Sequence, residues 1–189
     1  YISVTGVQTC ALPIFMESIL AGALESGCAT DAAIASSLAQ ARKFWDMREH
    51  VPLAQADDGP NIKHDVSLPT SAIPTFVAVC NDMLRKKYPG IRIINYGHLG
   101  DGNLHYNVAG PSSAETESFF TNRSKEIQAL VYQEVEKLNG SISAEHGVGQ
   151  QKVDYLKGHR GEVALNVMQA IKKALDPHNL MNPGKVVSL

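Results

Sequence analysis

The chain has few cysteines, no long apolar run and no excess of basic residues. Its three cysteines, Cys10, Cys28 and Cys80, lack the CxxC spacing of thiolate zinc sites and do not suggest a disulfide framework. No apolar run approaches the roughly 20 residues that span a bilayer. With 17 Lys and Arg and a net charge of −2, the composition argues against a nucleic-acid-binding surface. These absences favour a globular protein of a reducing, cytoplasmic compartment.

Two common catalytic motifs are also missing. No GxGxxG follows a strand and opens a helix, which excludes a Rossmann dinucleotide site in this chain. The glycines of residues 97–102 are suggestively spaced, but no helix pattern follows them. No GxSxG nucleophile elbow occurs either.

The first residues need separate treatment. Residues 4–14 (VTGVQTCALPI) resemble the translation of a common sequencing-library adapter. No Lys or Arg precedes Arg42, so the basic region of a signal peptide is absent. We therefore expect residues 1–14 to be a non-native leader, residues 15–189 to form one domain, and the natural protein to be longer at its N-terminus.

Helices alternate with a few strands along the rest of the chain. Apolar spacing predicts helices over 16–25, 32–47, 70–88, 114–138, 152–156 and 161–175, and strands over 62–68, 91–96, 104–108 and 141–144. One strand pair forms a hairpin, which favours an α+β fold, an antiparallel sheet under helices, over a doubly wound parallel sheet. Alternation places Lys63 and Asp65 on an exposed strand face.

The hairpin is centred on the sequence GHLGDGNLHYN, residues 97–107. Asp-Gly between apolar-containing runs is a strong hairpin signal, because a tight turn needs positive φ at its centre. A turn at Asp101-Gly102 makes His98 face His105 directly, with Tyr96 and Asn107 on the same face. Two adjacent imidazoles suit a metal ion, although two incidental histidines on a hairpin are the plain alternative.

Two further features could carry chemistry. Glu145 and His146 precede Gly147 in a glycine-rich loop, and two histidines with one glutamate around an open position form a known catalytic metal arrangement. A solvated Glu-His pair is the alternative. Arg48 closes a predicted helix, where a guanidinium could bind a substrate carboxylate or simply complement the helix end. Lys63 is a weaker candidate for a second anion contact.

Five stretches together resemble one family. They are DMRE (46–49), KHDVSLP (63–69), GHLGDGNLH (97–105), SAEHGVG (143–149) and DP (176–177) with NPGK (182–185), and they occur in the family order. The chain thereby resembles the C-terminal substrate (cap) domain of FAD-linked oxidases of the vanillyl-alcohol-oxidase-like superfamily. The similar branch holds D-2-hydroxyglutarate dehydrogenase, D-lactate dehydrogenase and the glycolate oxidase large subunit.

The resemblance implies a flavin enzyme that oxidises a D-2-hydroxy acid to a 2-oxo acid, on a ferredoxin-like antiparallel sheet covered by helices. The residues that match family sites are His98, His105 and Glu145 for a divalent metal (zinc or manganese), His146 for the catalytic base, Arg48, Lys63 and Asn107 for the substrate, and Asn182 and Lys185 for contact with the FAD domain. Implied partners are a small 2-hydroxy acid, an FAD domain in cis and an unidentified electron acceptor, with a homodimer left open. Localisation would be cytoplasmic, with association to a membrane through partners left open, or mitochondrial in a eukaryote.

The chain also departs from the family. We expect this chain to lack the FAD-binding domain that precedes the cap domain in the family, and also the first strand of the cap sheet, and we therefore expect this fragment alone to be inactive. Pro52 stands where the resemblance implies a hydroxyl side chain in the hydroxyglutarate enzyme, which weakens a hydroxyglutarate-specific assignment. Two alternatives stay open: a metal-dependent hydrolase with the same His/His/Glu site, and a non-catalytic ferredoxin-like interaction module.

Overall fold

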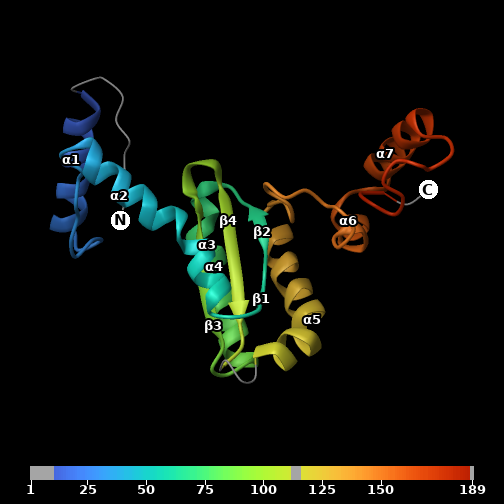
Figure 1. The fold of residues 1–189 in the computed structure, drawn as a ribbon, viewed down its shortest axis with the longest axis horizontal. Coiled ribbons are helices and arrows are strands. Elements are labelled where there is room, and N and C mark those ends of the chain that lie inside the picture. The colour runs from blue at the N-terminus through green and yellow to red at the C-terminus, as the bar shows by residue number, and fades with distance from the viewer. Residues whose placement is uncertain (1–10, 112–115, 188–189) are drawn as a thin grey trace. The chain divides into compact units, whose positions relative to one another are not determined.

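The structure, a computed structural model, describes residues 11–111 and 116–187 (Figure 1). Cys10 and most of the predicted leader lie outside the described residues. The chain divides into two compact units, residues 1–58 and residues 59–189, here called the N-terminal and C-terminal units. Within the described ranges, no helix has the length and apolarity needed to cross a membrane.

The N-terminal unit is helical, with α1 (Ala11–Glu25), α2 (Leu38–Glu49) and α3 (Val51–Asp57). The helix predicted from residue 32 begins only at Leu38, where the Ser37 hydroxyl accepts a hydrogen bond of 3.2 Å from the Gln40 amide. Helix α3 was not predicted. Pro52 ends one helix but also opens the next, because the first turn of a helix needs no N–H donor from that residue.

The C-terminal unit combines a sheet with helices, which confirms the predicted α+β class. Its elements are β1 (Asn61–Ile62), β2 (Asp65–Ser67), the 3₁₀ turn η1 (Thr70–Ala72), α4 (Ile73–Lys87), β3 (Arg92–His98), the 3₁₀ turn η2 (Leu99–Asp101), β4 (Asn103–Ala109), α5 (Thr116–Lys137), α6 (Val153–His159) and α7 (Glu162–Leu175). That the sheet lacks the family's first strand stays a prediction.

Strand β4 is the centre of an antiparallel sheet. It pairs with β3 along one edge and with β1 and β2 in succession along the other. The single strand predicted over 62–68 is therefore two short strands, and between them the His64 carbonyl still accepts a hydrogen bond of 2.9 Å from the Tyr106 amide. The strand predicted over 141–144 forms only one bridge, between Ser141 and Ser67.

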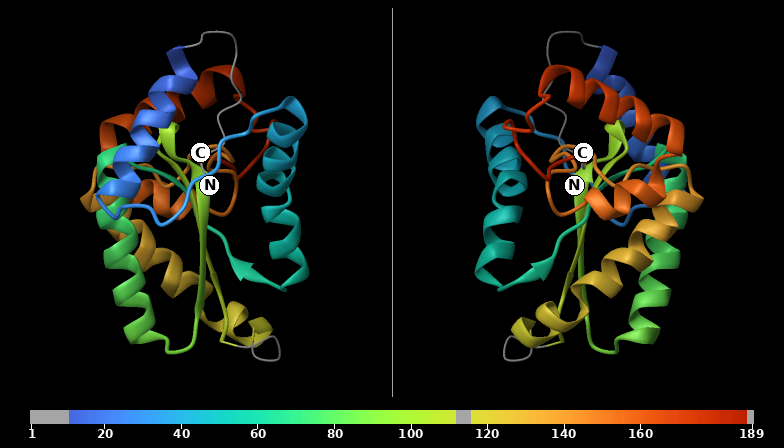
Figure 2. Two further views of the ribbon diagram at one scale, coloured as in Figure 1. Left: turned by 90° about the vertical axis from the view of Figure 1, so that its left-hand side faces the viewer. Right: turned by 90° about the vertical axis from the view of Figure 1, so that its right-hand side faces the viewer.

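The core lies between the sheet and two helices. Helices α4 and α5 cover the same face of the sheet (Figure 2), so that Phe76 meets Tyr106 with ring centroids 5.4 Å apart. The buried apolar side chains come from α4 (Ile73, Phe76, Cys80, Leu84), from α5 (Ile127, Val131, Tyr132, Val135) and from the sheet (Ile62, Val66, Leu104, Tyr106, Val108). The opposite sheet face is thereby left for polar side chains.

The hairpin forms where it was predicted, but its register differs. His98 pairs with Asn103 and Tyr96 pairs with His105, so the predicted direct pairing of His98 with His105 is wrong. The cause is a four-residue connection, in which η2 is followed by Gly102 with φ of +70°. A Cβ at Gly102 would lie 2.1 Å from the Leu68 main-chain oxygen, so both backbone angle and space require glycine here.

Candidate metal and substrate site

The histidines His98 and His105 lie on the sheet face opposite α4 and α5. Side chains alternate along a strand, so Leu104 and Tyr106, which enter the core, leave His105 on the other side. Antiparallel pairing places Tyr96 and Asp65 beside His105 on that face, and His98 lies two residues beyond Tyr96. The hairpin thus presents both imidazoles to one site, diagonally rather than directly opposed.

Glu145 reaches the same face by a segment that follows β2. The Ser141 amide donates to the Ser67 oxygen at 2.7 Å, and the Ser67 amide donates to the Ser141 oxygen at 2.9 Å. The Ala144 amide then lies 3.2 Å from the Asp65 main-chain oxygen. These contacts carry the chain from the end of α5 past the edge of β2 to the two histidines.

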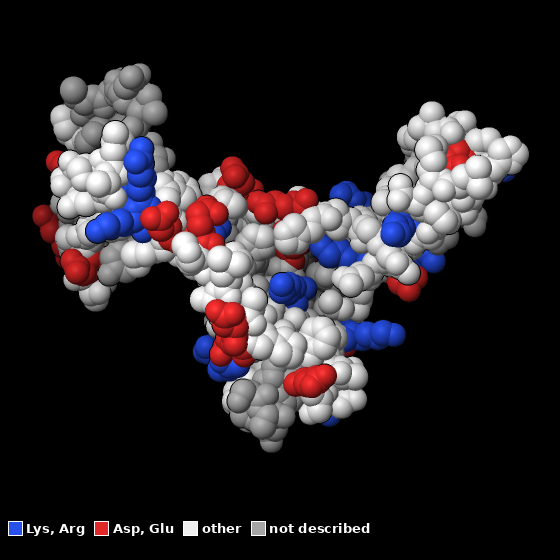
Figure 3. Space-filling model, viewed as in Figure 1, with Lys and Arg blue, Asp and Glu red and all other residues white. Residues whose placement is uncertain are grey.

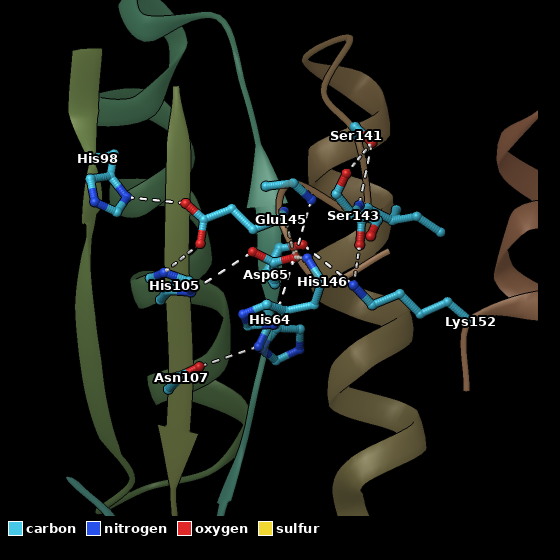
Figure 4. A network of polar contacts seen from close by, with 12 residues as sticks. His64, Asp65, His98, His105, Asn107, Ser141, Ser143, Glu145, His146 and Lys152 are labelled. Atoms are coloured by element: carbon cyan, nitrogen blue, oxygen red, sulfur yellow. Dashed lines mark hydrogen bonds and ion pairs between the residues drawn. The ribbon is translucent and has the colours of Figure 1, made fainter. Parts of the chain in front are cut away.

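The three predicted metal ligands converge. Glu145 Oε1 lies 3.2 Å from His98 Nδ1, and Glu145 Oε2 lies 3.7 Å from His105 Nε2 (Figure 4). Ligand atoms about 2.0–2.1 Å from a tetrahedral ion are separated by about 3.3 Å, which is close to both distances. One ligand atom from each of the three residues lies within 4.8 Å of the other two, so the donor set fits a divalent ion, and three protein ligands leave a further position for a substrate atom.

His146 stands beside this set. Its ring stacks on that of His105 with centroids 5.7 Å apart, and its Nδ1 lies 3.8 Å from Asp65 Oδ2. The side chain is largely exposed, so its other nitrogen, Nε2, is accessible to a small molecule. A proton acceptor thus lies next to the three candidate ligands.

Asp65 is the member of the site that the sequence did not predict. Strand alternation predicted an exposed side chain, but the residue is only 4% exposed and its carboxylate lies under the Ala144–His146 segment. Burial raises its pKa, but hydrogen bonds from the His146 and Glu145 amides and the nearby cationic groups outweigh burial and hold the pKa below its usual value. The register of β2 on β4 was the missing information, because only that pairing places Asp65 beside His105.

The other predicted site residues lie in several elements. Lys63 is exposed between β1 and β2, whereas Asn107 is buried in β4 with its Oδ1 3.3 Å from the His64 amide. Arg48 lies in the last turn of α2, in the N-terminal unit. Asn182 and Lys185 line an open groove of about 560 Å³ along α7. Their predicted contacts with substrate and FAD domain stay predictions.

Acidic and basic side chains are interspersed on the face shown in Figure 3, which agrees with the small net charge.

The profile of the family "FAD linked oxidases, C-terminal domain" matches residues 15–186. The chain belongs to this family. Its relatives include D-2-hydroxyglutarate dehydrogenase of Xanthomonas citri pv. viticola, 40% identical over 163 residues, which cover 86% of this chain and 34% of the relative.

Other relatives of this C-terminal domain carry the same name. The D-2-hydroxyglutarate dehydrogenase of Stutzerimonas stutzeri is 36% identical over 163 residues, 86% of this chain and 35% of that protein. The mitochondrial D-2-hydroxyglutarate dehydrogenase of Arabidopsis thaliana is 37% identical over 172 residues, 91% of this chain and 29% of that protein. The chain thus spans about a third of the length of these relatives.

Proposed function

We propose that this chain forms the substrate- and metal-binding part of a flavin-dependent dehydrogenase that oxidises a D-2-hydroxy acid to a 2-oxo acid. The observation that carries the proposal is the convergence of His98, His105 and Glu145, with His146 beside them, in a domain of this family. The similarity to D-2-hydroxyglutarate dehydrogenases supports the substrate class. Because the family resemblance implies a hydroxyl side chain in the hydroxyglutarate enzyme where this chain has Pro52, the proposal extends to D-2-hydroxy acids in general and not to one of them.

Each residue of the site would act through its own atoms. His98 Nδ1, His105 Nε2 and a Glu145 carboxylate oxygen would hold a divalent ion, either zinc or manganese, because both accept nitrogen and oxygen donors. A bound ion would polarise the substrate hydroxyl, and FAD, bound mainly by a separate domain in cis, would accept the electrons of the oxidation. Arg48, Lys63 and Asn107 would bind the substrate outside the metal ligands, while Asn182 and Lys185 would contact the FAD domain.

His146 would take the proton of the substrate hydroxyl. Its Nδ1 lies 3.8 Å from the Asp65 carboxylate, so Nε2 would be the nitrogen that accepts the proton.

A chimera tests the proposal. Residues 15–189 would replace the matching region of the Xanthomonas citri relative, and flavin reduction would be followed with D-2-hydroxyglutarate, D-lactate and glycolate. We expect bleaching of the flavin absorbance by at least one acid, slowed at least 100-fold in His146→Asn and unaffected in the exposed control His178→Asn. A chimera that retains FAD and the metal but is reduced by none of the acids would overturn the proposal. Substrate hydrolysis by the chain without flavin would instead support the hydrolase alternative.

A further inference from the structure

We propose that Asp65 is the positioning residue of this site: one carboxylate oxygen fixes the main chain of Glu145 and His146, and the other orients the ring of His105. That the site binds a metal ion and a substrate is taken from the proposed function, on which this proposal rests. It assigns a role to a side chain that neither binds the ion nor touches the substrate.

The first oxygen of Asp65 holds the loop. Oδ2 accepts hydrogen bonds from three successive amides, those of Ala144 at 3.2 Å, Glu145 at 3.0 Å and His146 at 2.8 Å (Figure 4). Bonds to an ionised acceptor are stronger than those between neutral groups. Glu145 and His146 are neighbours in sequence with different proposed tasks, so fixing these amides positions a metal ligand and a proton acceptor together.

The second oxygen of Asp65 faces the hairpin. Oδ1 is buried, has no hydrogen-bond partner among the described residues and lies 3.8 Å from His105 Nδ1. The other ring nitrogen, His105 Nε2, lies 3.7 Å from Glu145 Oε2. This order of carboxylate, imidazole and metal position is the one in which an outer carboxylate sets the orientation and tautomer of a ligating histidine.

Asp65 could also be considered as a ligand, because it forms a second close group with His105 and His146. Its contacts argue against that role. Oδ2 already accepts three hydrogen bonds, and the residue is only 4% exposed. Because Oδ2 is occupied and Oδ1 is buried beside His105 Nδ1, we assign the carboxylate a supporting role and not that of a ligand.

Lys152 anchors the same segment from the other side. Its Nζ donates to the Ile142 oxygen at 2.8 Å and to the Asp65 main-chain oxygen at 3.5 Å. The ammonium group therefore links β2 to the segment that carries Glu145. The charge of Asp65 is also compensated by this neighbouring cation, which makes an ionised carboxylate tolerable under the loop.

The test compares three variants of the full chain: Asp65→Asn, Asp65→Ala and the control Asp82→Asn. Asp82 is an exposed carboxylate on α4 that pairs with Lys86 at 2.8 Å, so the control removes one acidic charge outside the site. Asparagine at position 65 keeps an oxygen that can accept amide bonds but removes the charge, and it guards against a failure of the alanine variant to fold. The readouts are amide hydrogen exchange by NMR without metal, and Co²⁺ titration followed by visible absorption.

We expect the amides of Glu145 and His146 to exchange at least tenfold faster in Asp65→Ala, and to a smaller degree in Asp65→Asn. The core amides of Val108 and Val131 should keep their wild-type rates, because a general loss of stability would accelerate all of them together. Co²⁺ affinity should fall 10- to 100-fold with a changed visible spectrum, as for other outer carboxylates of metal-bound histidines. The Asp82→Asn variant should match the wild type in every measurement.

Two results would overturn the proposal. Wild-type exchange at Glu145 and His146 in Asp65→Ala would show that the carboxylate does not hold the loop. Unchanged Co²⁺ affinity and spectrum would show that it does not orient His105. If the wild-type chain itself bound no Co²⁺, the metal part of the proposed function and the orienting role would fail together, while the exchange rates would still decide whether Asp65 fixes the loop.

Discussion

His64 Nδ1 lies 2.6 Å from the main-chain oxygen of Tyr106, and the histidine is 0% exposed. A carbonyl oxygen only accepts hydrogen bonds, so Nδ1 carries the proton. The other nitrogen, Nε2, is buried without a hydrogen-bond partner among the described residues. Burial lowers the pKa of His64 from 6.5 to about 4, which keeps the imidazole neutral in the folded protein near pH 7.

This buried imidazole predicts a loss of stability in mild acid. Between pH 6.5 and about 4 the unfolded chain binds a proton at His64 that the folded chain does not. Folding stability therefore falls as the pH falls through this window, by up to about 3 kcal/mol, and the contribution of His64 is constant below it. Urea unfolding at pH 7, 5.5 and 4.5 measures the effect.

The control separates His64 from other acid-sensitive groups. His64→Gln removes the titrating group, so its stability should depend less steeply on pH than that of the wild type. The exposed His178→Asn should retain the wild-type dependence. Equal slopes in the wild type and His64→Gln would contradict the prediction.

The position of Gly102 predicts that adding a single methyl group there strongly lowers the free energy of unfolding. Gly102→Ala combines a left-handed backbone with a Cβ placed 2.1 Å from the Leu68 oxygen, and we expect several kcal/mol of destabilisation. Gly184→Ala is the matched control, because Gly184 has φ of +71° but no atom within 4 Å of an added Cβ. It should lose only about 1–2 kcal/mol. Similar losses of unfolding free energy in both variants would show that the close approach of Leu68 does not matter.

The two described cysteines should react very differently with thiol reagents. Cys80 is 0% exposed in the core, and burial raises its pKa to about 12, whereas Cys28 is exposed. In a Cys10→Ser background at pH 8, a disulfide reagent should modify one thiol quickly and the second only after denaturant is added. Cys28→Ser should abolish the fast phase, and fast labelling that persists in this variant would contradict the buried position of Cys80.

Metal binding should raise the stability of the isolated chain. An ion that binds only the folded site adds about 2.7 kcal/mol when its free concentration is 100 times Kd. We expect Zn²⁺ or Mn²⁺ to raise the unfolding temperature of the wild type, chelator to reverse the rise, and His98→Ala or His105→Ala to abolish it. His178→Ala should behave as the wild type, and a rise that survives in His98→Ala would place the ion elsewhere.

The sequence correctly predicted the hairpin and its polar face, even though the predicted register was wrong. The assumed and observed registers differ by two residues, and alternation has a period of two, so His98 and His105 share a face in either case. The turn itself was less predictable. Asp101-Gly102 indicated a two-residue turn, but η2 and the left-handed Gly102 form a longer connection, which moves His98 opposite Asn103.

Other features depend on contacts between distant parts of the chain. The convergence of Glu145 with His98 follows from the bridge between Ser67 and Ser141, and no local pattern contains that contact. The sequence pattern offered Glu145 as a possible metal ligand, and the family resemblance then assigned it to the same site as His98 and His105. Asp65 was missed because strand alternation predicted an exposed face. In the structure this face is covered by the segment whose amides donate to the Asp65 carboxylate.

The separation of the ligands along the chain has a consequence for folding. His98 and His105 lie on one hairpin, a kind of local structure that forms within microseconds, whereas Glu145 follows α5 and joins them only when the chain after the hairpin folds back onto the sheet. Glu145 lies 47 residues from His98 and 40 residues from His105 along the chain, so its contacts with them close much longer loops than the hairpin does. An ion bound by the two histidines during folding would also bind Glu145 and would thereby stabilise this long-range contact.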